Sequence, residues 1–221
     1  MIDKRKIEIK NKGFPPKPLS PAIDATRLYY TEHSKEYISR TRGFDLSGTW
    51  QLGLKYFSPE SRILDLGCGS GRDMRFFGQR GYLAIGLDFS APLAASARRF
   101  SEQEVVVGSF RRLPFKNNSF DGIWSIASLL HIPRTIISDV LIEIHRVLRP
   151  GGIFISSIKL GSGQHQDQDG KLFVYYSVDA WSEIVEGAGF KTVVLVEDTE
   201  EREKDNQVIV KVPWLVCVAG R

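Results

Sequence analysis

Three glycines at alternating positions, directly after a short apolar run, constrain this chain of 221 residues more than any other feature. Residues 63–66 (Ile-Leu-Asp-Leu) have the character of a buried strand, and the alternating glycines at 67–71 lead into a helix predicted at 72–79. A second strand, predicted at 83–88, ends in the carboxylate of Asp88. This order of strand, glycine turn, helix, strand and acid predicts an open α/β sheet that holds a nucleoside at the carboxyl ends of its strands.

Strands and helices continue to alternate up to about residue 158. The further predicted strands are 104–107, 120–126 and 152–158, and the further predicted helices are 91–100 and 136–148. Such alternation predicts parallel strands joined by right-handed crossover helices that cover both faces of the sheet. A turn is expected at Arg149-Pro150-Gly151-Gly152, before the last of these strands.

The C-terminal part follows a different pattern. A polar loop is expected at 161–170, followed by a helix at 179–188. The β-branched runs at 190–196 and 208–218 predict an antiparallel pair. The segment 197–205 holds six acids against two bases, and we expect it to be the solvated loop that joins the pair.

The N-terminal part divides into a tail and a set of helices. Residues 1–21 contain four prolines and are expected to be disordered or extended. Residues 1–20 hold six Lys and Arg against two acids, whereas the rest of the chain balances at 24 against 24, so the net charge of +4 belongs to the tail and not to a folded face. Residues 22–42 predict one or two short helices lying on the domain, and 47–57 predicts another.

The composition indicates the cellular compartment in which the protein works. Only Cys68 and Cys217 are present, so a disulfide framework is not expected and a reducing cytoplasm fits. No apolar run approaches the ~20 residues of a membrane span. Residues 1–12 are basic with no apolar stretch behind them, so we expect no secretory signal and no membrane partner. The sequence leaves the oligomeric state open.

The acid inside the glycine turn indicates what kind of ligand the turn takes. Glycine permits positive φ angles and removes the Cβ that would strike a ligand. Dinucleotide-binding turns have the spacing G-x-G-x-x-G, which seats a pyrophosphate on the helix end. Here the run is D-x-G-x-G-x-G, from Asp65 to Gly71. Asp65 would repel a pyrophosphate but suits a ligand that carries a cationic amino group.

This run resembles the first motif of the class I S-adenosylmethionine-dependent methyltransferases, and further signals follow in the expected order. Asp88 resembles the acid that ends the second strand in that family. Leu113-Pro114-Phe115 with Asn118-Ser119-Phe120-Asp121 resembles the approach to the fourth strand, and Val147-Leu148-Arg149-Pro150-Gly151-Gly152 resembles the turn before the fifth. The resemblance covers about residues 45–196 and is nearest to the small-molecule group, including the methyltransferase domain 11/25-like, tellurite-resistance-like and ubiquinone-biosynthesis-like branches.

The resemblance implies a fold and a domain layout. The fold is a Rossmann-like, doubly wound α/β sheet of seven strands, mostly parallel with a C-terminal antiparallel strand and with helices on both faces. Residues 22–221 would form one methyltransferase domain. Within it, 22–58 would be an N-terminal helical lid and 160–178 an insertion on the acceptor side.

The resemblance also assigns the cofactor S-adenosylmethionine, with S-adenosylhomocysteine as product, and no metal. Gly67 and Gly69 would let the methionine part pass close to the backbone, and Asp65 would approach its ammonium group. Asp88 would accept hydrogen bonds from both ribose hydroxyls. The other expected cofactor contacts are Tyr37 in the lid, Cys68, Gly71, Arg72, Phe89, Ser109, Phe110 and Ser125.

One position departs from the family pattern. Family members commonly have an acid after the third strand, where it receives the adenine amino group. Here Ser109 stands at the matching position and offers only a neutral partner. The ring and backbone N–H of Phe110 would share adenine recognition with it.

His131, which follows the fourth predicted strand, is the candidate base or acceptor-orienting group. The alternative is a structural histidine that hydrogen-bonds neighbouring backbone. Lys159 and His165 could face the acceptor or the solvent. Three aromatic residues of the insertion form either a wall of the acceptor pocket or packing under a loop: Phe173, Tyr175 and Tyr176.

The expected function is transfer of a methyl group from S-adenosylmethionine to O or N of a small-molecule acceptor by in-line displacement. A sulfonium methyl is already electrophilic, so the protein mainly aligns the nucleophile and excludes water. Nucleic acid is not the expected partner, because no separate nucleic-acid-binding module is visible. Two alternatives stay open: an RNA-nucleoside methyltransferase that uses the basic tail, and a non-catalytic protein that binds S-adenosylmethionine.

Overall fold

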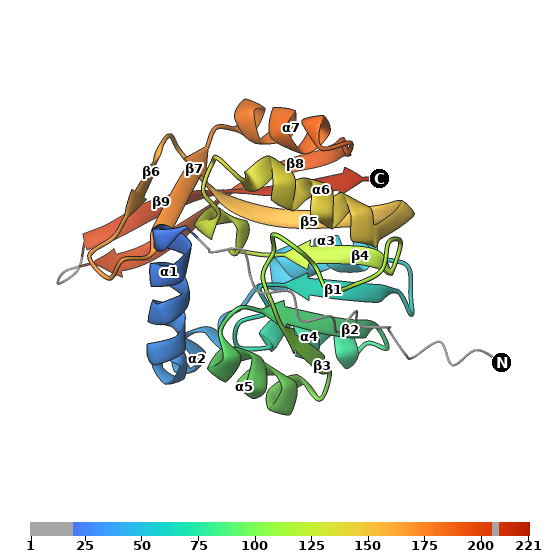
Figure 1. The fold of residues 1–221 in the computed structure, drawn as a ribbon, viewed down its shortest axis with the longest axis horizontal. Helices are drawn as coiled ribbons and strands as arrows, with labels where there is room; N and C mark the ends of the chain where they lie inside the picture. The colour runs from blue at the N-terminus through green and yellow to red at the C-terminus, as the bar shows by residue number, and fades with distance from the viewer. Residues whose placement is uncertain (1–19, 205–207) are drawn as a thin grey trace.

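A computed structural model describes residues 20–204 and 208–221, and its centre is one sheet (Figure 1). The strands among these residues are β1 (Arg62–Leu66), β2 (Leu83–Asp88), β3 (Glu104–Val107), β4 (Phe120–Ser125), β5 (Leu148–Leu160), β6 (Gln164–Gln166), β7 (Leu172–Tyr176), β8 (Lys191–Lys204) and β9 (Val208–Gly220). The helices are α1 (Pro21–Glu32), α2 (Ser34–Thr41), α3 (Ser47–Tyr56), α4 (Arg72–Gly78), α5 (Ala91–Ser101), the 3₁₀ turn η1 (Leu129–His131), α6 (Ile137–Val147) and α7 (Val178–Gly187).

The first five strands form the parallel half of the sheet, in the order β3-β2-β1-β4-β5. Strand β1 lies between β2 and β4, with Leu64 opposite Ile85 on one side and Ile123 on the other. Strand β9 then pairs with β5 in the antiparallel sense, and β8 pairs with β9. The predicted doubly wound sheet with a C-terminal antiparallel strand is therefore confirmed.

Successive residues of each central strand enter opposite cores, because side chains alternate across a sheet. Ile63 packs with α3, α4 and α5, whereas its neighbour Leu64 packs with α6 and α7. The sequence of helix α6 has the apolar spacing of a helix with one buried face. It buries a stripe of residues at helical spacing against this second core: Ile137, Val140, Leu141, Ile144 and Val147.

The lid helices α1 and α2 lie across the carboxyl ends of the parallel strands, at the left of Figure 1. Helix α1 begins at Pro21, and the Ser20 hydroxyl accepts a hydrogen bond of 3.4 Å from the backbone N–H of Ile23. Thr26 Oγ1 then accepts a bond of 2.9 Å from the backbone N–H of Leu172 in β7. Residues 1–19 of the predicted tail lie outside the described residues.

The insertion at 160–178 adds strands that the sequence did not predict. The segment expected to be a polar loop contains β6, which pairs in the antiparallel sense with β7, and Lys159 and Leu160 of β5 pair with Tyr175 and Tyr176. The sheet thus has nine strands among the described residues, where seven were expected. The extra hairpin stays on the sheet because alternate β7 residues, such as Leu172 and Val174, are buried in the core.

The prediction of a loop at 197–205 was wrong up to residue 204. Strand β8 continues to Lys204, paired with β9 throughout. The part of a hairpin that extends beyond the core needs hydrogen-bond partners for its backbone, but its side chains need not be buried. Charged side chains are therefore tolerated there when the facing strand is rich in β-branched residues. The Trp214 indole adds a cross-strand bond of 3.0 Å to Glu200.

The expected turn at Arg149–Gly152 is instead the start of β5. Helix α6 ends at Val147 and β5 begins at the next residue. The register between β4 and β5 shifts between Phe120 and Gly122, and Gly151 takes a φ of 75°. The glycine therefore absorbs a bulge within a strand.

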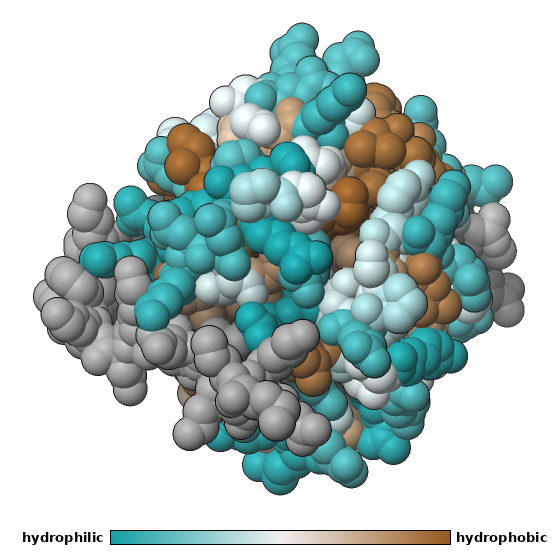
Figure 2. Space-filling view, turned by 90° about the vertical axis from the view of Figure 1, so that its right-hand side faces the viewer, coloured by the Kyte–Doolittle hydropathy of each residue, from teal (hydrophilic) through white to brown (hydrophobic). Residues whose placement is uncertain are grey.

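The face at the amino ends of the parallel strands is mainly hydrophilic (Figure 2), with small apolar groups set among polar ones. Within the described ranges, no helix has the length and apolar character to cross a membrane.

Asp73 ties three elements together behind the glycine turn. Its Oδ1 accepts bonds from the Trp50 indole of α3 at 3.0 Å and from Arg72 at 2.8 Å. Its Oδ2 accepts a bond of 3.0 Å from the buried Trp124 indole of β4 and a second bond from Arg72 at 3.2 Å. One buried carboxylate thus satisfies two indoles and a guanidinium.

Replacing Asp73 with Ala should therefore lower the free energy of unfolding by about 3–5 kcal/mol, because the buried Trp124 N–H and the Arg72 guanidinium lose their shared partner. Asp73→Asn should cost less, since its amide oxygen still accepts one set of bonds. Urea unfolding followed by tryptophan fluorescence measures both. Equal stability of Asp73→Ala and wild type would show that this network does not hold the fold.

Candidate functional site

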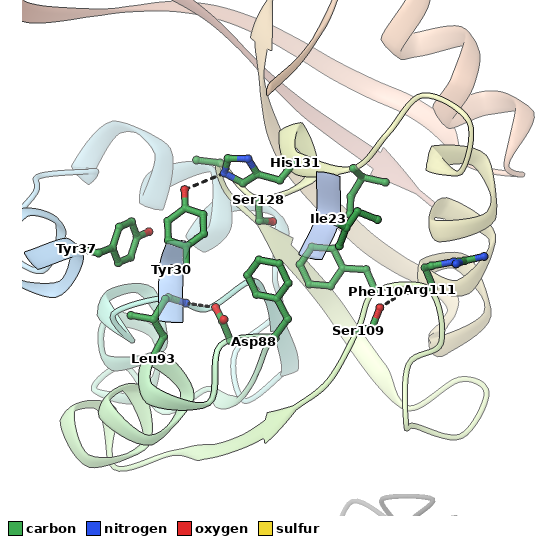
Figure 3. A pocket seen from close by; sticks show the side chains of 15 residues that line it. Ile23, Tyr30, Tyr37, Asp88, Leu93, Ser109, Phe110, Arg111, Ser128 and His131 are labelled. Carbon is green, nitrogen blue, oxygen red and sulfur yellow. Dashed lines mark hydrogen bonds between the residues drawn. The ribbon is translucent and has the colours of Figure 1, made fainter. Parts of the chain in front are cut away.

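A cavity lies at the carboxyl ends of β1, β2 and β4, under the lid (Figure 3). Its walls are the glycine turn, the end of β2, the segment after β3, the segment after β4 and the helices α1 and α2. The enclosed space is about 60 Å³. The lining residues are Ile23, Tyr30, Tyr37, Gly67, Gly69, Asp88, Phe89, Leu93, Ser109, Phe110, Arg111, Ala127, Ser128, His131 and Ile132.

The glycine turn needs glycine for two reasons. Gly67 and Gly69 have φ angles of 84° and 51°, which favour a residue without Cβ. A Cβ on Gly67 would lie 2.5 Å from Ser128 Cβ, and one on Gly69 would lie 3.0 Å from the Tyr37 hydroxyl. The turn is therefore held against the segment after β4 on one side and against the lid on the other.

Asp88 fixes the position of this turn. Its Oδ2 accepts a bond of 2.9 Å from the backbone N–H of Gly69, and its Oδ1 accepts one of 2.9 Å from the backbone N–H of Ser90. Each carboxylate oxygen keeps a second lone pair. The side chain is only 4% exposed, and burial raises the pKa of Asp88 to about 6.

Asp65 lies behind the turn as a buried acid, only 3% exposed. Its Oδ2 is buried without a hydrogen-bond partner among the described residues. Burial, with smaller contributions from the charges of Asp73 and Asp88, raises the pKa of Asp65 well above its usual range, and Arg72 opposes the shift. Three acids near one cation form an environment that favours a positively charged ligand.

Ser109 and Phe110 form the wall at the end of β3. The Phe110 ring lies 3.2 Å from the place that a Cβ on Gly67 would take, and Figure 3 shows it facing the interior. The Ser109 hydroxyl accepts a bond of 3.3 Å from the backbone N–H of Arg111. This end of the cavity thus offers one aromatic face and one hydroxyl, while the Arg111 side chain extends away from it (Figure 3).

His131 lies beside Tyr30 in the cavity wall, and a hydrogen bond joins the two side chains (Figure 3). Its Nδ1 lies 2.6 Å from the carbonyl oxygen of Leu172, which can only accept, so Nδ1 carries the proton. Its Nε2 then accepts the bond of 2.9 Å from the Tyr30 hydroxyl. Burial lowers the pKa of His131 to about 4, which keeps the ring neutral near pH 7.

The lid fills the cavity with aromatic side chains. The Tyr30 and Tyr37 rings meet edge to face with centroids 5.2 Å apart, and Tyr30 lies 6.3 Å from the Phe89 ring. Burial raises the pKa of Tyr37 to about 12, so its hydroxyl stays protonated. Because the free space of about 60 Å³ is far below the roughly 300–1,000 Å³ of small-molecule sites, a ligand of nucleoside size requires these rings to move aside.

The structure brings together eight of the thirteen residues proposed from sequence as cavity lining: Tyr37, Gly67, Gly69, Asp88, Phe89, Ser109, Phe110 and His131. The other five lie behind or beside the cavity. Asp65 is described above, and Arg72 pairs with Asp73. Cys68 packs beside Gly86, where its Sγ lies 2.8 Å from the place of a Cβ.

The last two of these five have structural partners. The Ser125 hydroxyl bonds Ser128 Oγ at 2.7 Å and the Leu66 carbonyl at 3.3 Å. Gly71 has a φ of 80°, and its Cβ would meet the backbone of Ala97 in α5 at 2.8 Å. Gly71 therefore lets α4 pack closely on α5.

Sequence reasoning missed the face of α1 that enters the site. The sequence predicted one or two helices at 22–42 without identifying which face of the first turns inward, and the large apolar Leu28 is 50% exposed. The inward face is Ile23, Thr26 and Tyr30, at spacings of three and four residues. The polar Thr26 in the middle of this face interrupts its apolar pattern, so apolar periodicity alone does not identify it.

The residues of 159–176 that were predicted to face the acceptor do not line the cavity. Phe173 comes nearest, with its ring 5.1 Å from that of His131, and Lys159 lies over Phe173 at 4.3 Å. Tyr176 is buried in the core, and the exposed His165 stacks on Tyr175. The expected aromatic wall is thus reduced to Phe173, which supports the histidine from outside.

Comparisons with known proteins identify the family of this chain. A family model for a methyltransferase domain matches residues 64–156. A protein of Encephalitozoon cuniculi named as a methyltransferase is 31% identical over 195 residues, which cover 78% of this chain and 89% of that protein. The 24-methylenesterol C-methyltransferase 2 of Oryza sativa is 38% identical over 106 residues, 44% of this chain. The match spans only 29% of that enzyme's length.

Among solved structures, the 1,6-didemethyltoxoflavin N1-methyltransferase of Burkholderia thailandensis has the same fold. The TM-score is 0.69 and the identity 21%, and the alignment covers 92% of each chain. That protein was solved with 1,6-didemethyltoxoflavin and S-adenosylhomocysteine bound.

The close approach at the glycine turn can be tested with two matched substitutions. Gly67 and Gly81 have φ angles of 84° and 85°, but a Cβ at Gly81 would meet nothing within 4 Å. Gly81→Ala should cost about 1–2 kcal/mol for the left-handed conformation alone. Gly67→Ala should cost a further ~1–3 kcal/mol from the clash with Ser128. Urea unfolding of both variants gives the difference, and equal costs would rule out a steric role.

Proposed function

Because this chain belongs to the class I S-adenosylmethionine-dependent methyltransferases, we propose that it transfers the methyl group of S-adenosylmethionine to an oxygen or nitrogen atom of a small-molecule acceptor. One observation carries the proposal. The glycine turn and Asp88 face His131 and Tyr30 across one enclosed cavity. A cofactor side and a proton-accepting side therefore share the same small space.

The residues of the site fit the cofactor. Asp65 Oδ2, a buried acceptor without a partner in the described chain, suits the ammonium group. Gly67 and Gly69 leave the backbone open where a Cβ would obstruct it. Asp88 keeps one lone pair on each oxygen for the two ribose hydroxyls, and Phe110 with Ser109 offers a face and a hydroxyl to adenine.

The bound cofactor supplies a sulfonium methyl group, which is electrophilic without further activation. The protein has to hold the acceptor in line with it and exclude water. The lid serves both needs, because α1 and α2 close the cavity with Tyr30 and Tyr37. Lid closure thus supports a reaction shielded from solvent.

His131 is proposed to take the proton that an O–H or N–H acceptor loses. Its Nδ1 is held by the Leu172 carbonyl, so the lone pair on Nε2 points toward the cavity and now accepts from Tyr30. An acceptor hydroxyl that replaced Tyr30 would make the same bond. Its neutral ring is in the correct protonation state to act as a base.

The small size of the acceptor is supported by the shape of the site. The cavity is enclosed by the lid, and the rings of Tyr30, Tyr37 and Phe110 line it. A relative is named for methylation of a 24-methylenesterol, and a protein of the same fold is named for methylation of 1,6-didemethyltoxoflavin, and both of these compounds are small molecules. Because the match spans only a third or less of the plant sterol enzymes' length, the acceptor of this chain is argued from its own cavity.

Asp88→Ala should weaken binding of S-adenosylhomocysteine by about 1–3 kcal/mol, or roughly 5- to 150-fold, because two ribose hydroxyls lose a charged acceptor. Isothermal titration calorimetry on the folded variant measures the loss. In the wild type, affinity should decrease as the pH falls below about 6, since the protonated carboxyl accepts less well. Asp88→Asn should lack that part of the pH dependence, and unchanged affinity in Asp88→Ala would remove the ribose assignment.

His131→Ala should lower turnover by about 10²–10⁴-fold, the usual contribution of a general base, while S-adenosylhomocysteine affinity stays within a few-fold of wild type. Turnover is followed as S-adenosylhomocysteine production with a panel of phenolic and amine acceptors. The control is His165→Ala, an exposed histidine outside the cavity, which should keep full turnover. Loss of affinity without loss of turnover would return His131 to a structural role.

A further inference from the structure

A second hollow, of about 420 Å³, lies between α3, α4 and α5 beside the end of α2. It shares no lining residue with the cavity of the site. Four arginines line it: Arg42, Arg72, Arg75 and Arg80. No acid is found among its described lining residues. We call this hollow the arginine groove.

Helix α4 carries two of these arginines, Arg72 and Arg75, at a spacing of three residues on one face together with Phe76. Arg80 lies in the turn that follows the last helical residue, Gly78. Arg42 approaches the same groove from the end of α2.

Three of the four guanidinium groups have no carboxylate partner in the part of the chain described. Only Arg72 is paired, with Asp73 at 2.8 Å. Arg75 donates to the Phe100 carbonyl at 2.7 Å and Arg80 to the Phe76 carbonyl at 3.1 Å. These bonds use one of the five donors that each guanidinium carries.

Of these three arginines, Arg42 has the least complete set of hydrogen bonds for its buried donors. Its NH2 donates to the Ser70 carbonyl at 3.3 Å and to Ser96 Oγ at 3.1 Å. Its Nε is buried without a hydrogen-bond partner among the described residues. The neighbouring charges of Arg75 and Arg99, after burial itself, lower the pKa of Arg42. Like charges are thus gathered here without a counter-charge.

Aromatic rings hold these cations in place. The Arg42 guanidinium lies 3.9 Å above the Phe100 ring, and that of Arg75 lies 4.7 Å from the same ring. Arg80 lies 3.8 Å above Phe76. Cation–π contacts restrict the side chains while leaving N–H donors at the ring edge free to bind. The groove is therefore a positively charged and partly preorganised surface.

We propose that the arginine groove binds a small ligand that carries two or more phosphate groups. Guanidinium forks match phosphate oxygens in pairs, and several arginines around one hollow match several such groups. The volume falls in the range of small-molecule sites, roughly 300–1,000 Å³. An extended nucleic acid would need a longer basic surface than these four arginines supply. The two nearby acids have other partners: Asp73 binds Arg72, and Asp45 accepts from the Ser47 backbone at 2.8 Å.

The test titrates inorganic pyrophosphate into the full chain by calorimetry at constant ionic strength. We expect saturable binding at one site. Arg75→Gln should weaken it by roughly tenfold or more, the equivalent of a charged hydrogen-bond partner. Arg80→Gln, at the exposed rim, is the second variant and should weaken it several-fold. Thermal unfolding confirms that each variant is folded.

Lys35→Gln is the matched control, because Lys35 is an exposed cation on α2 outside the groove. It removes the same unit charge, so its binding should stay within about twofold of wild type if the groove acts as a site and not through overall charge. Three results would overturn the proposal. They are the absence of saturation, an equal loss in Lys35→Gln and Arg75→Gln, and saturation by a single-stranded RNA oligonucleotide when pyrophosphate fails to bind.

Discussion

The hydrogen bond from the Gly69 N–H to Asp88 Oδ2, 2.9 Å long, is the interaction on which the site depends. It joins the turn that follows β1 to the end of β2, and these two strands are parallel neighbours. The backbone N–H of Gly67 also donates to the Leu87 carbonyl at 2.8 Å, so the turn is held to β2 at two points. Both bonds join groups of the protein itself, so the ends of the two strands set the shape of the turn. A raised pKa of about 6 for Asp88 is the consequence of burying the carboxylate that does this.

The N-terminal helices α1 and α2 form the part of the cavity wall that the sheet does not. Tyr37 closes over Gly69, and Tyr30 reaches His131, whose other nitrogen is fixed by the Leu172 carbonyl of the inserted strand β7. The three parts of the site therefore come from segments far apart in the chain: the N-terminal helices, the turn after β1 and the insertion after β5. Tyrosine suits the lid because its ring fills apolar space while its hydroxyl satisfies a buried partner.

Charge is separated within this small protein. Three buried acids, Asp65, Asp73 and Asp88, lie behind the glycine turn or beside it, while four arginines, of which only Arg72 has a carboxylate partner in the described chain, line the groove. The count of charges along the sequence assigned the net charge of +4 to the tail, because acids and bases balance in the rest of the chain. A balanced sum does not describe how charges are distributed in space, and the fold brings Arg42, Arg75 and Arg80 to one hollow whose described lining holds no acid.

The sequence by itself determined the order of elements, the parallel half of the sheet, the glycine turn and Asp88. These follow from apolar periodicity and from the conformational freedom of glycine, which act over a few neighbouring residues. The tertiary structure alone decided that Thr26 and Tyr30 face inward, that His131 is held by Leu172, and that residues 197–204 pair as a strand. Each of these depends on a partner many residues away, and a local pattern of side chains carries no information about which distant backbone group will satisfy it.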